Sequence, residues 1–184
     1  AKLYAEVGKI PEAIAISLEA KTRDPNFLSS KSEPGGYTQL ASLYEQNGQI
    51  NEAINTMLQG QEGDANFWAR DYSDPNAFRL ADYYEKSGQI NQAILTLEKI
   101  REKNTNYWKT KYYRVCELYD QSGNHEKAKQ VRAELIAIYE ELRAADINLF
   151  YESTEKLANL YLSEGQIQKA IKTLEKGKEN FDYF

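Results

Sequence analysis

The sequence predicts an all-α fold: a solenoid of antiparallel helix pairs with about four and a half repeats. One observation is a spacing that occurs five times, in which a tyrosine is followed by glycine four residues later and alanine nine residues later. Another is a small residue three positions before each tyrosine. Self-similarity over roughly 20–50 residues is typical of stacked repeats, because one repeat cannot bury its apolar face alone. The five sets are Tyr4/Gly8/Ala13, Tyr44/Gly48/Ala53, Tyr84/Gly88/Ala93, Tyr119/Gly123/Ala128 and Tyr161/Gly165/Ala170.

Each repeat is predicted to form two helices that are joined at the glycine. In the second repeat Tyr37, Leu40, Ala41 and Tyr44 fall on one face of a helix. Gly48 suits the left-handed conformation that ends a helix. A second apolar stripe then follows, made of Ala53, Ile54, Met57 and Leu58. Small residues on both helices should let the pair approach closely.

We expect the repeats to cover residues 1–27, 37–67, 77–107, 109–145 and 149–184 of a single array. Pro and Gly clusters predict loops at 28–36 and 68–76. Between Asn124 and Gly165 there is no Pro or Gly, which predicts two lengthened helices that meet near residues 144–148, each with about one added turn. Because Ala1 falls in the middle of a helix and the last residues form no polar cap, we expect a fragment of a longer chain.

Composition limits the classes of partner. The net charge is −5 and the pI is about 5.1, which disfavours a protein that binds nucleic-acid phosphates. No apolar run reaches the roughly 18 residues of a membrane helix, so we expect no membrane insertion. A single cysteine excludes an internal disulfide framework. The compartment stays open, with the cytoplasm favoured.

These residues resemble the tetratricopeptide repeat (TPR) family, whose pattern combines an aromatic residue, Leu, a small residue and Tyr with a later Ala and a large apolar residue. The resemblance covers essentially the whole chain and implies a right-handed superhelix whose first helices line a concave groove for another protein. Arg132 departs from the pattern, since it stands at the large apolar position of the fourth repeat. The closing proline of the family is also absent from repeats two to five.

The face of each first helix that packing does not use is the candidate partner-binding groove. Its residues are Thr38, Ser42, Glu45, Phe78, Asp82, Glu85, Tyr113, Glu117, Asp120, Glu155 and Asn159. They predict an acidic groove with an aromatic middle, which favours a basic peptide or helix as partner. The alternative is an ordinary solvated face. One family subtype binds chaperone C-termini through clustered Lys, Arg and Asn, and its function should not carry over to these acidic and aromatic positions.

No residue pattern predicts catalysis, a cofactor or a metal site. His125 is the single histidine and stands at a helix start where the other repeats have isoleucine. Cys116 takes an alanine position in the core, where a thiol acts as a small apolar group. We therefore expect that this chain is not an enzyme.

A second repeated feature is an Asn-aromatic segment, found as Asn26-Phe27-Leu28, Asn66-Phe67-Trp68 and Asn106-Tyr107-Trp108. The aromatic residues could close the end of each helix pair, or they could form a ledge for a partner. The regular spacing favours packing.

Three functions remain open. The favoured one is an interaction scaffold or adaptor that recruits another polypeptide into a larger complex. The alternative is a structural subunit that stacks through its terminal repeats. An RNA-binding helical repeat is a third, which the acidic charge and the irregular repeat lengths disfavour.

Overall fold

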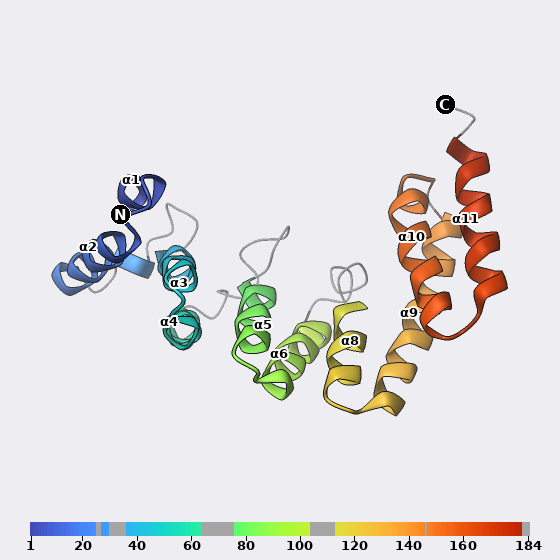
Figure 1. The fold of residues 1–184 in the computed structure, drawn as a ribbon, viewed down its shortest axis with the longest axis horizontal. Coiled ribbons are helices and arrows are strands. Elements are labelled where there is room, and N and C mark those ends of the chain that lie inside the picture. Colours follow the sequence, from blue (N-terminus) through green and yellow to red (C-terminus); the bar gives the residue numbers. More distant parts are fainter. Residues whose placement is uncertain (25–26, 30–35, 64–75, 104–112, 146, 182–184) are drawn as a thin grey trace. The chain divides into compact units, whose positions relative to one another are not determined.

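The computed structural model describes residues 1–24, 27–29, 36–63, 76–103, 113–145 and 147–181. Every regular element within these ranges is a helix (Figure 1). The chain divides into two compact units, Ala1–Lys99 and Ile100–Phe184. Within each unit the helices pack in sequence order, as the predicted helix pairs require.

The first unit begins with the short helix α1 (Lys2–Glu6). It is followed by α2 (Ile10–Arg23), α3 (Gly36–Gln46), α4 (Ile50–Gly63), α5 (Asn76–Lys86) and α6 (Ile90–Lys103), whose last residues belong to the second unit. Helix α2 packs against α3, α3 against α4, and α4 against α5. The 3-10 turn η1 (Phe27–Ser29) contacts α2, α3 and α4.

The second unit contains α8 (Tyr113–Gln121), α9 (His125–Ala145), α10 (Ile147–Ser163) and α11 (Ile167–Phe181). Helix α9 packs against both α8 and α10, and α11 packs against α10 (Figure 1). The first helices of two successive repeats, α8 and α10, therefore both lie on α9.

The turn between paired helices explains the spacing of tyrosine and glycine. Gly48 has a φ of +74°, and its N–H donates to the carbonyl of Glu45 at 2.9 Å. The next N–H, of Gln49, donates to the carbonyl of Tyr44 at 2.8 Å. This pair of bonds is the Schellman motif, which satisfies the last carbonyls of a helix and needs a left-handed residue at its fifth position. The glycines of the other four repeats have the same positive φ and the same bonds.

Small residues occupy the contact between paired helices, as predicted. Ala41 and Ala53 are completely buried in the second repeat, and Cys116 and Ala128 are buried in the fourth. A larger side chain at these positions would hold the two helix axes apart. The small residue is thus what allows each hairpin to close.

The two lengthened helices are confirmed, but they are longer than predicted. Helix α9 has 21 residues, against 14 in α2, α4 and α6. Helix α10 has 17 residues, against 11 in α3 and α5. Each gains close to two turns rather than one. The reason is that only one residue separates α9 from α10, so positions that other repeats place between their helix pairs are helical here.

The first predicted loop contains structure at its start. Leu28, in η1, is only 2 % exposed, whereas Phe27 is 47 % exposed. Leu28 therefore closes the end of this helix pair, and the expectation that the aromatic residue does so is wrong here. A Cβ at Gly36, where α3 begins, would lie 2.8 Å from the Leu28 Cα, so glycine allows this close approach. The segments Asn66-Phe67-Trp68 and Asn106-Tyr107-Trp108 lie outside the described residues. Residues 30–35 of the first predicted loop and 68–75 of the second also lie outside them.

Candidate functional site

The second unit has a cavity of about 370 Å³ between α8 and α10. Helix α9 contributes one lining residue, Arg132. The other lining residues are Tyr113, Cys116, Glu117 and Asp120 of α8 and Glu155, Lys156, Asn159, Leu160 and Ser163 of α10. All five residues that the sequence analysis selected in this part of the chain line the cavity: Tyr113, Glu117, Asp120, Glu155 and Asn159. The structure brings them together from two helices.

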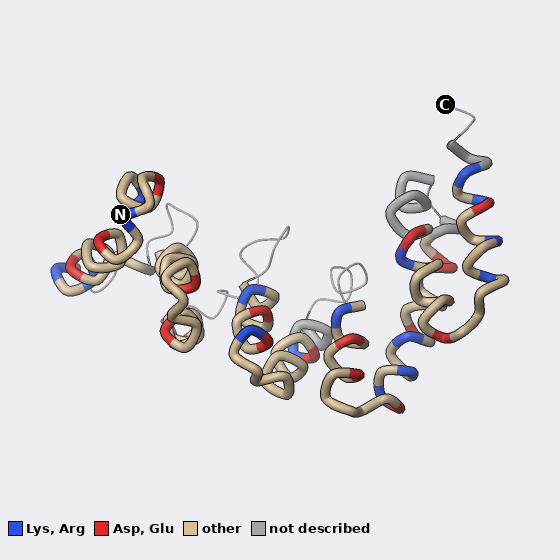
Figure 2. Tube along the Cα trace, in the orientation of Figure 1, with Lys and Arg blue, Asp and Glu red and all other residues tan. Residues whose placement is uncertain are grey.

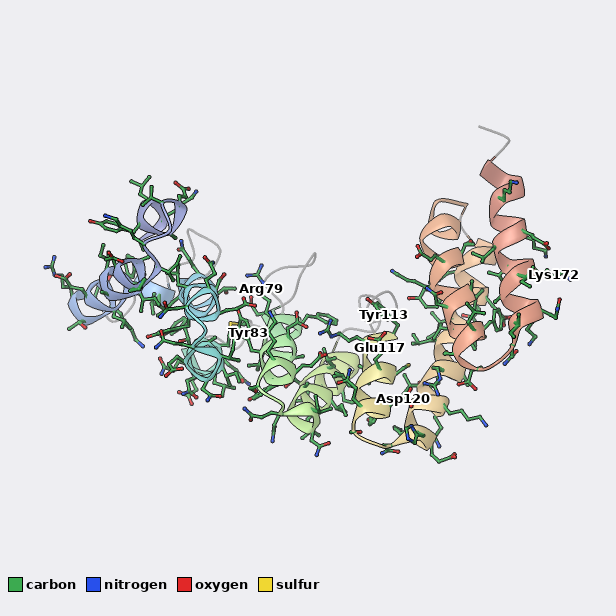
Figure 3. The ribbon with its side chains drawn as sticks, viewed as in Figure 1. Arg79, Tyr83, Tyr113, Glu117, Asp120 and Lys172 are labelled. Atoms are coloured by element: carbon green, nitrogen blue, oxygen red, sulfur yellow. The ribbon has the colours of Figure 1, made fainter. Side chains whose placement is uncertain are left out.

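Helix α8 presents its lining residues as a row. Tyr113, Glu117 and Asp120 are four and three residues apart and lie along one side of the helix (Figure 3). Seven residues at 1.5 Å each make this row about 10 Å long. The opposite side is anchored by Val115 and Leu118, which are buried. Tyr113 stays 41 % exposed, so its ring is available at one end of the row.

Helix α10 supplies the facing wall. Leu157 and Ala158 are buried, and Leu160 forms part of the apolar floor of the cavity. Glu155 and Asn159 are exposed, one helical turn apart. The wall thus combines an acidic and an amide side chain above an apolar base.

Arg132 connects the two walls at the far end of the row. Its Nη1 donates to Asp120 Oδ2 of α8 at 2.6 Å, and its Nε donates to Glu164 Oε1, just after α10, at 2.5 Å. The Arg132 side chain is 13 % exposed. Asp120 also contacts His125 Nδ1 at 3.0 Å through its other oxygen. A guanidinium is suited to such a bridge because its planar N–H groups can address two carboxylates at once.

These contacts keep the network ionised. The hydrogen bond with His125 lowers the pKa of the Asp120 carboxyl, burial opposes that shift, and Arg132 lowers the pKa further. Burial alone would lower the pKa of Arg132, but the hydrogen bonds with Glu164 and Asp120 raise it above its ordinary value. The charge of Asp120 is therefore compensated from within the chain. By contrast, Glu117 and Glu155 are exposed and make no ion pair with any other residue that the structure describes.

The buried thiol in the lining is unreactive. Cys116 is 3 % exposed, and burial raises its pKa to about 12. Because the thiolate is the nucleophilic form, this residue contributes packing rather than chemistry at neutral pH. In the described part of the chain no cluster of three or more His, Cys, Asp or Glu residues could hold a metal ion. Within the same residues no helix has the length and apolar character needed to cross a membrane.

Sequence profiles described as tetratricopeptide repeat match residues 34–66, 76–106 and 152–179. The chain belongs to the tetratricopeptide repeat family. Proteins of this family are generally interaction scaffolds and are usually non-catalytic. The matched segments correspond to the second, third and fifth repeats of the TPR array.

Solved TPR structures share the fold. MamA superposes with a TM-score of 0.64 at 20 % identity, covering 98 % of this chain and 93 % of its own. A protein of nearly identical TPR-like repeats from Podosopora anserina gives 0.64 at 22 % identity, with 97 % and 90 % covered. A tetratricopeptide repeat protein from Parabacteroides merdae gives 0.55 at 17 % identity, with 94 % and 74 % covered. No curated protein matches the sequence.

In the TPR repeats of the first unit, several predicted groove residues are used for packing. Thr38 is buried and donates its hydroxyl to Asn76 Oδ1 at 3.3 Å. Phe78 is only 9 % exposed. Side chains at these two positions have little surface to offer a partner. Ser42, Asp82 and Glu85 are half-buried.

Glu45 connects two repeats. Its carboxylate accepts hydrogen bonds from the Lys86 ammonium and from the hydroxyl of Tyr83, both on α5. Burial raises the pKa of Tyr83 strongly, and the nearby Glu45 charge adds to the shift. Tyr83 is labelled beside α3 in Figure 3. Glu45 therefore holds α3 and α5 together, a use that the groove prediction did not include.

Of the described residues that line the cavity, the groove prediction did not include Cys116, Arg132, Lys156, Leu160 and Ser163. Ser163 could have been found, since it lies one turn beyond Asn159 on the same helix face. Arg132 carried a signal as well, because a charged residue at an apolar TPR position needs partners. In Figure 2 a basic position at the start of α8 is followed by acidic positions along that helix, and the first half of α9 has basic positions after an acidic one near its start.

Proposed function

We propose that this TPR array is a protein-interaction scaffold whose second-unit cavity binds a basic side chain of a partner polypeptide. The observation that supports it most directly is the pair of exposed carboxylates, Glu117 and Glu155, which line one cavity from two different helices. Two acids on opposite walls attract a cation between them more strongly than either acid alone. A lysine or arginine of the partner would satisfy both.

The apolar part of the lining favours the stem of such a side chain. Lys and Arg bury their methylene groups on apolar surface while their charged ends stay at polar groups. Leu160 and the exposed ring of Tyr113 provide that surface, and a cation close to the ring gains a further contribution. Lys156 also lines the cavity, which disfavours a uniformly positive partner. We therefore propose a segment with an isolated basic residue next to an apolar one.

The first-unit positions play a smaller part in this proposal. Thr38 and Phe78 are buried and Glu45 is engaged with α5, which leaves Ser42, Asp82 and Glu85 as partly exposed candidates. The proposed binding function therefore centres on the second unit.

The test is a titration of the ¹⁵N-labelled chain with a blocked ten-residue peptide that carries one Lys next to one Leu. We expect shifts at the amides of α8 and α10. The substitution Glu117→Lys should weaken binding about tenfold, because it replaces attraction by repulsion. Raising the salt from 0.05 to 0.5 M should also weaken it, since exposed charges are screened.

The matched control is Glu141→Lys, an exposed position of α9 that does not line the cavity. It makes the same change in net charge and should leave the affinity close to that of the wild type. Equal binding of a peptide with Glu in place of Lys, or equal losses in both variants, would contradict the proposal.

Self-association is the second candidate, and an exposed apolar stripe favours it. Ile171 and Leu174 of α11 are 44 % and 48 % exposed. The residues at the same repeat positions, Ile54 and Met57 of α4 and Ile94 and Leu97 of α6, are all buried. The stripe thus has the character of a surface between TPR repeats. A second copy could cover it by stacking.

A further inference from the structure

The position of Arg132 is apolar or small in the other four repeats. Thirteen residues after the repeat tyrosine the chain has Ser17, Met57, Leu97 and Leu174, and in the fourth repeat it has Arg132. Met57 and Leu97 are fully buried. A guanidinium at this depth must be paired, because burying an uncompensated charge is costly.

The partners of Arg132 come from the two walls of the cavity. Asp120 belongs to α8, Glu164 follows α10, and their side chains are 39 % and 15 % exposed. Together they form a position for a cation at one end of the cavity. Arg132, which α9 contributes to the cavity lining, fills that position.

We propose that Arg132 determines the specificity of the cavity by occupying this second cation position itself. The inference rests on the proposed function. With Arg132 in place, Asp120 and Glu164 both accept hydrogen bonds from its guanidinium, and among the described acids of the lining Glu117 and Glu155 are left to attract the partner. The cavity is thereby limited to one basic side chain, although the row of lining residues on α8 carries a second acid, Asp120, about 4.5 Å along the helix axis from Glu117.

The charge of the lining supports this assignment. Among the described residues that line the cavity there are three acids (Glu117, Asp120, Glu155) and two bases (Arg132, Lys156), which together carry a net charge of −1. Replacing Arg132 by Met makes it −2 and exposes the second cation position. Methionine is the residue that the second repeat has there, so the substitution suits the packing of a TPR helix pair.

The probes are two blocked ten-residue peptides in an Ala/Ser background with one Leu. One carries a single Lys, and the other carries two Lys residues separated by one residue, about 6.6 Å apart in an extended chain. Dissociation constants come from ¹⁵N chemical-shift titrations of the full chain. For the wild type we expect the two peptides to bind within about twofold of each other. For Arg132→Met the two-Lys peptide should gain roughly three- to tenfold over the one-Lys peptide.

Two variants separate charge from shape. Asp120→Asn/Arg132→Met returns the lining charge to −1 and should restore the ratio of the wild type. Arg132→Lys keeps the positive charge but not the planar fork, and it should also keep that ratio. If Arg132→Met unfolds in a circular dichroism melt, Arg132→Gln provides the same neutral substitution with a polar head that can still donate to both acids.

The outcomes distinguish a failure of the proposed binding function from a failure of the role of Arg132 alone. If the wild type shows no shifts in α8 and α10 with either peptide, the proposed function and this inference both fail. If the wild type binds but the peptide ratio is unchanged in Arg132→Met and Arg132→Gln, only the role of Arg132 is overturned. An unrestored ratio in the double variant would assign Arg132 a purely structural part and would overturn the inference as well.

Discussion

The repeats differ from one another at individual positions of a shared pattern, and the residues at these positions give the array its chemical variety. The environment of a position is set by the repeat, so Cys116 is buried where other repeats bury alanine. His125 stands where they have isoleucine, yet it lies at the exposed start of α9 and contacts Asp120. Its predicted place at a helix start is confirmed. What differs between repeats is therefore the side chain and its partners rather than the backbone.

The thiol of Cys116 should make stability depend on pH in the alkaline range. Its pKa is about 12 in the folded chain and near 9.0 when unfolded, so the folded state retains a proton that the unfolded state releases between these values. The wild type should thus lose stability relative to Cys116→Ala as pH rises above about 9, by at most about 1.4 kcal/mol per unit. At pH 7.5 the two should differ by no more than about 1 kcal/mol, since alanine is the usual residue here.

Urea unfolding at pH 7.5 and pH 10 measures both differences. Because Lys and Tyr groups titrate equally in both proteins, subtracting the two curves isolates the thiol. Parallel stability curves across this range would show that Cys116 is not buried as the structure describes.

At the scale of elements, contact distances between helices are set by small residues at the crossing points. Gly177 of α11 is buried against Thr154 of α10, and a Cβ at Gly177 would lie 2.8 Å from the Thr154 Cγ2. Glycine normally weakens a helix interior relative to alanine. Its presence in α11 is explained by this close approach.

Gly177→Ala should therefore destabilise the chain, although alanine is the better helix former. We expect a net loss of about 1–2 kcal/mol in the free energy of unfolding, because overpacking exceeds the gain in helix propensity. Thr154→Ser removes the methyl group in the way and keeps the hydroxyl. The double variant Gly177→Ala/Thr154→Ser should recover most of the loss in a thermal or urea unfolding experiment, whereas additive losses would point to a cause other than this contact.

At the scale of the whole molecule, the first and the fifth repeats leave apolar side chains exposed at positions that other described repeats bury. Ile171 and Leu174 are exposed on α11, and Leu3 is 76 % exposed just before the first repeat tyrosine. Leu43 and Leu118 hold the same repeat position as Leu3 and are buried. The two surfaces are the counterparts that pack together between neighbouring repeats, so two copies could meet through them.

Ile171→Glu/Leu174→Glu should accordingly abolish self-association. We expect the wild type to sediment as dimers or larger species at about 100 µM, and the double variant as a monomer, because a buried carboxylate without a partner disfavours the contact. Leu95→Glu, at a similarly exposed apolar residue of α6, is the control and should behave as the wild type. A monomeric wild type at this concentration would remove the second candidate function.

Much of the fold follows from the sequence alone. The helix pairs, the glycine turns and the buried small residues depend on spacings of a few residues, and such spacings are read directly from the chain. The same register placed Tyr113, Glu117 and Asp120 on one side of α8, and the structure finds them lining a cavity with Glu155 and Asn159. Local periodicity determines which way a helical side chain points.

Only the tertiary structure decided which of those side chains stay available. Arg132 pairs with residues 12 and 32 positions away, Lys86 reaches Glu45 across 41 residues, and Thr38 meets Asn76 across 38. The contacts of Arg132 with Glu164, of Lys86 with Glu45 and of Thr38 with Asn76 depend on how neighbouring repeats cross. The contact of Arg132 with Asp120 depends on how the two helices of one repeat cross. The spacing of residues along a single helix encodes neither crossing. The sequence determined the faces of the helices, and the packing of helices within and between repeats decided that Asp120 and Glu45 are paired while Glu117 and Glu155 remain exposed.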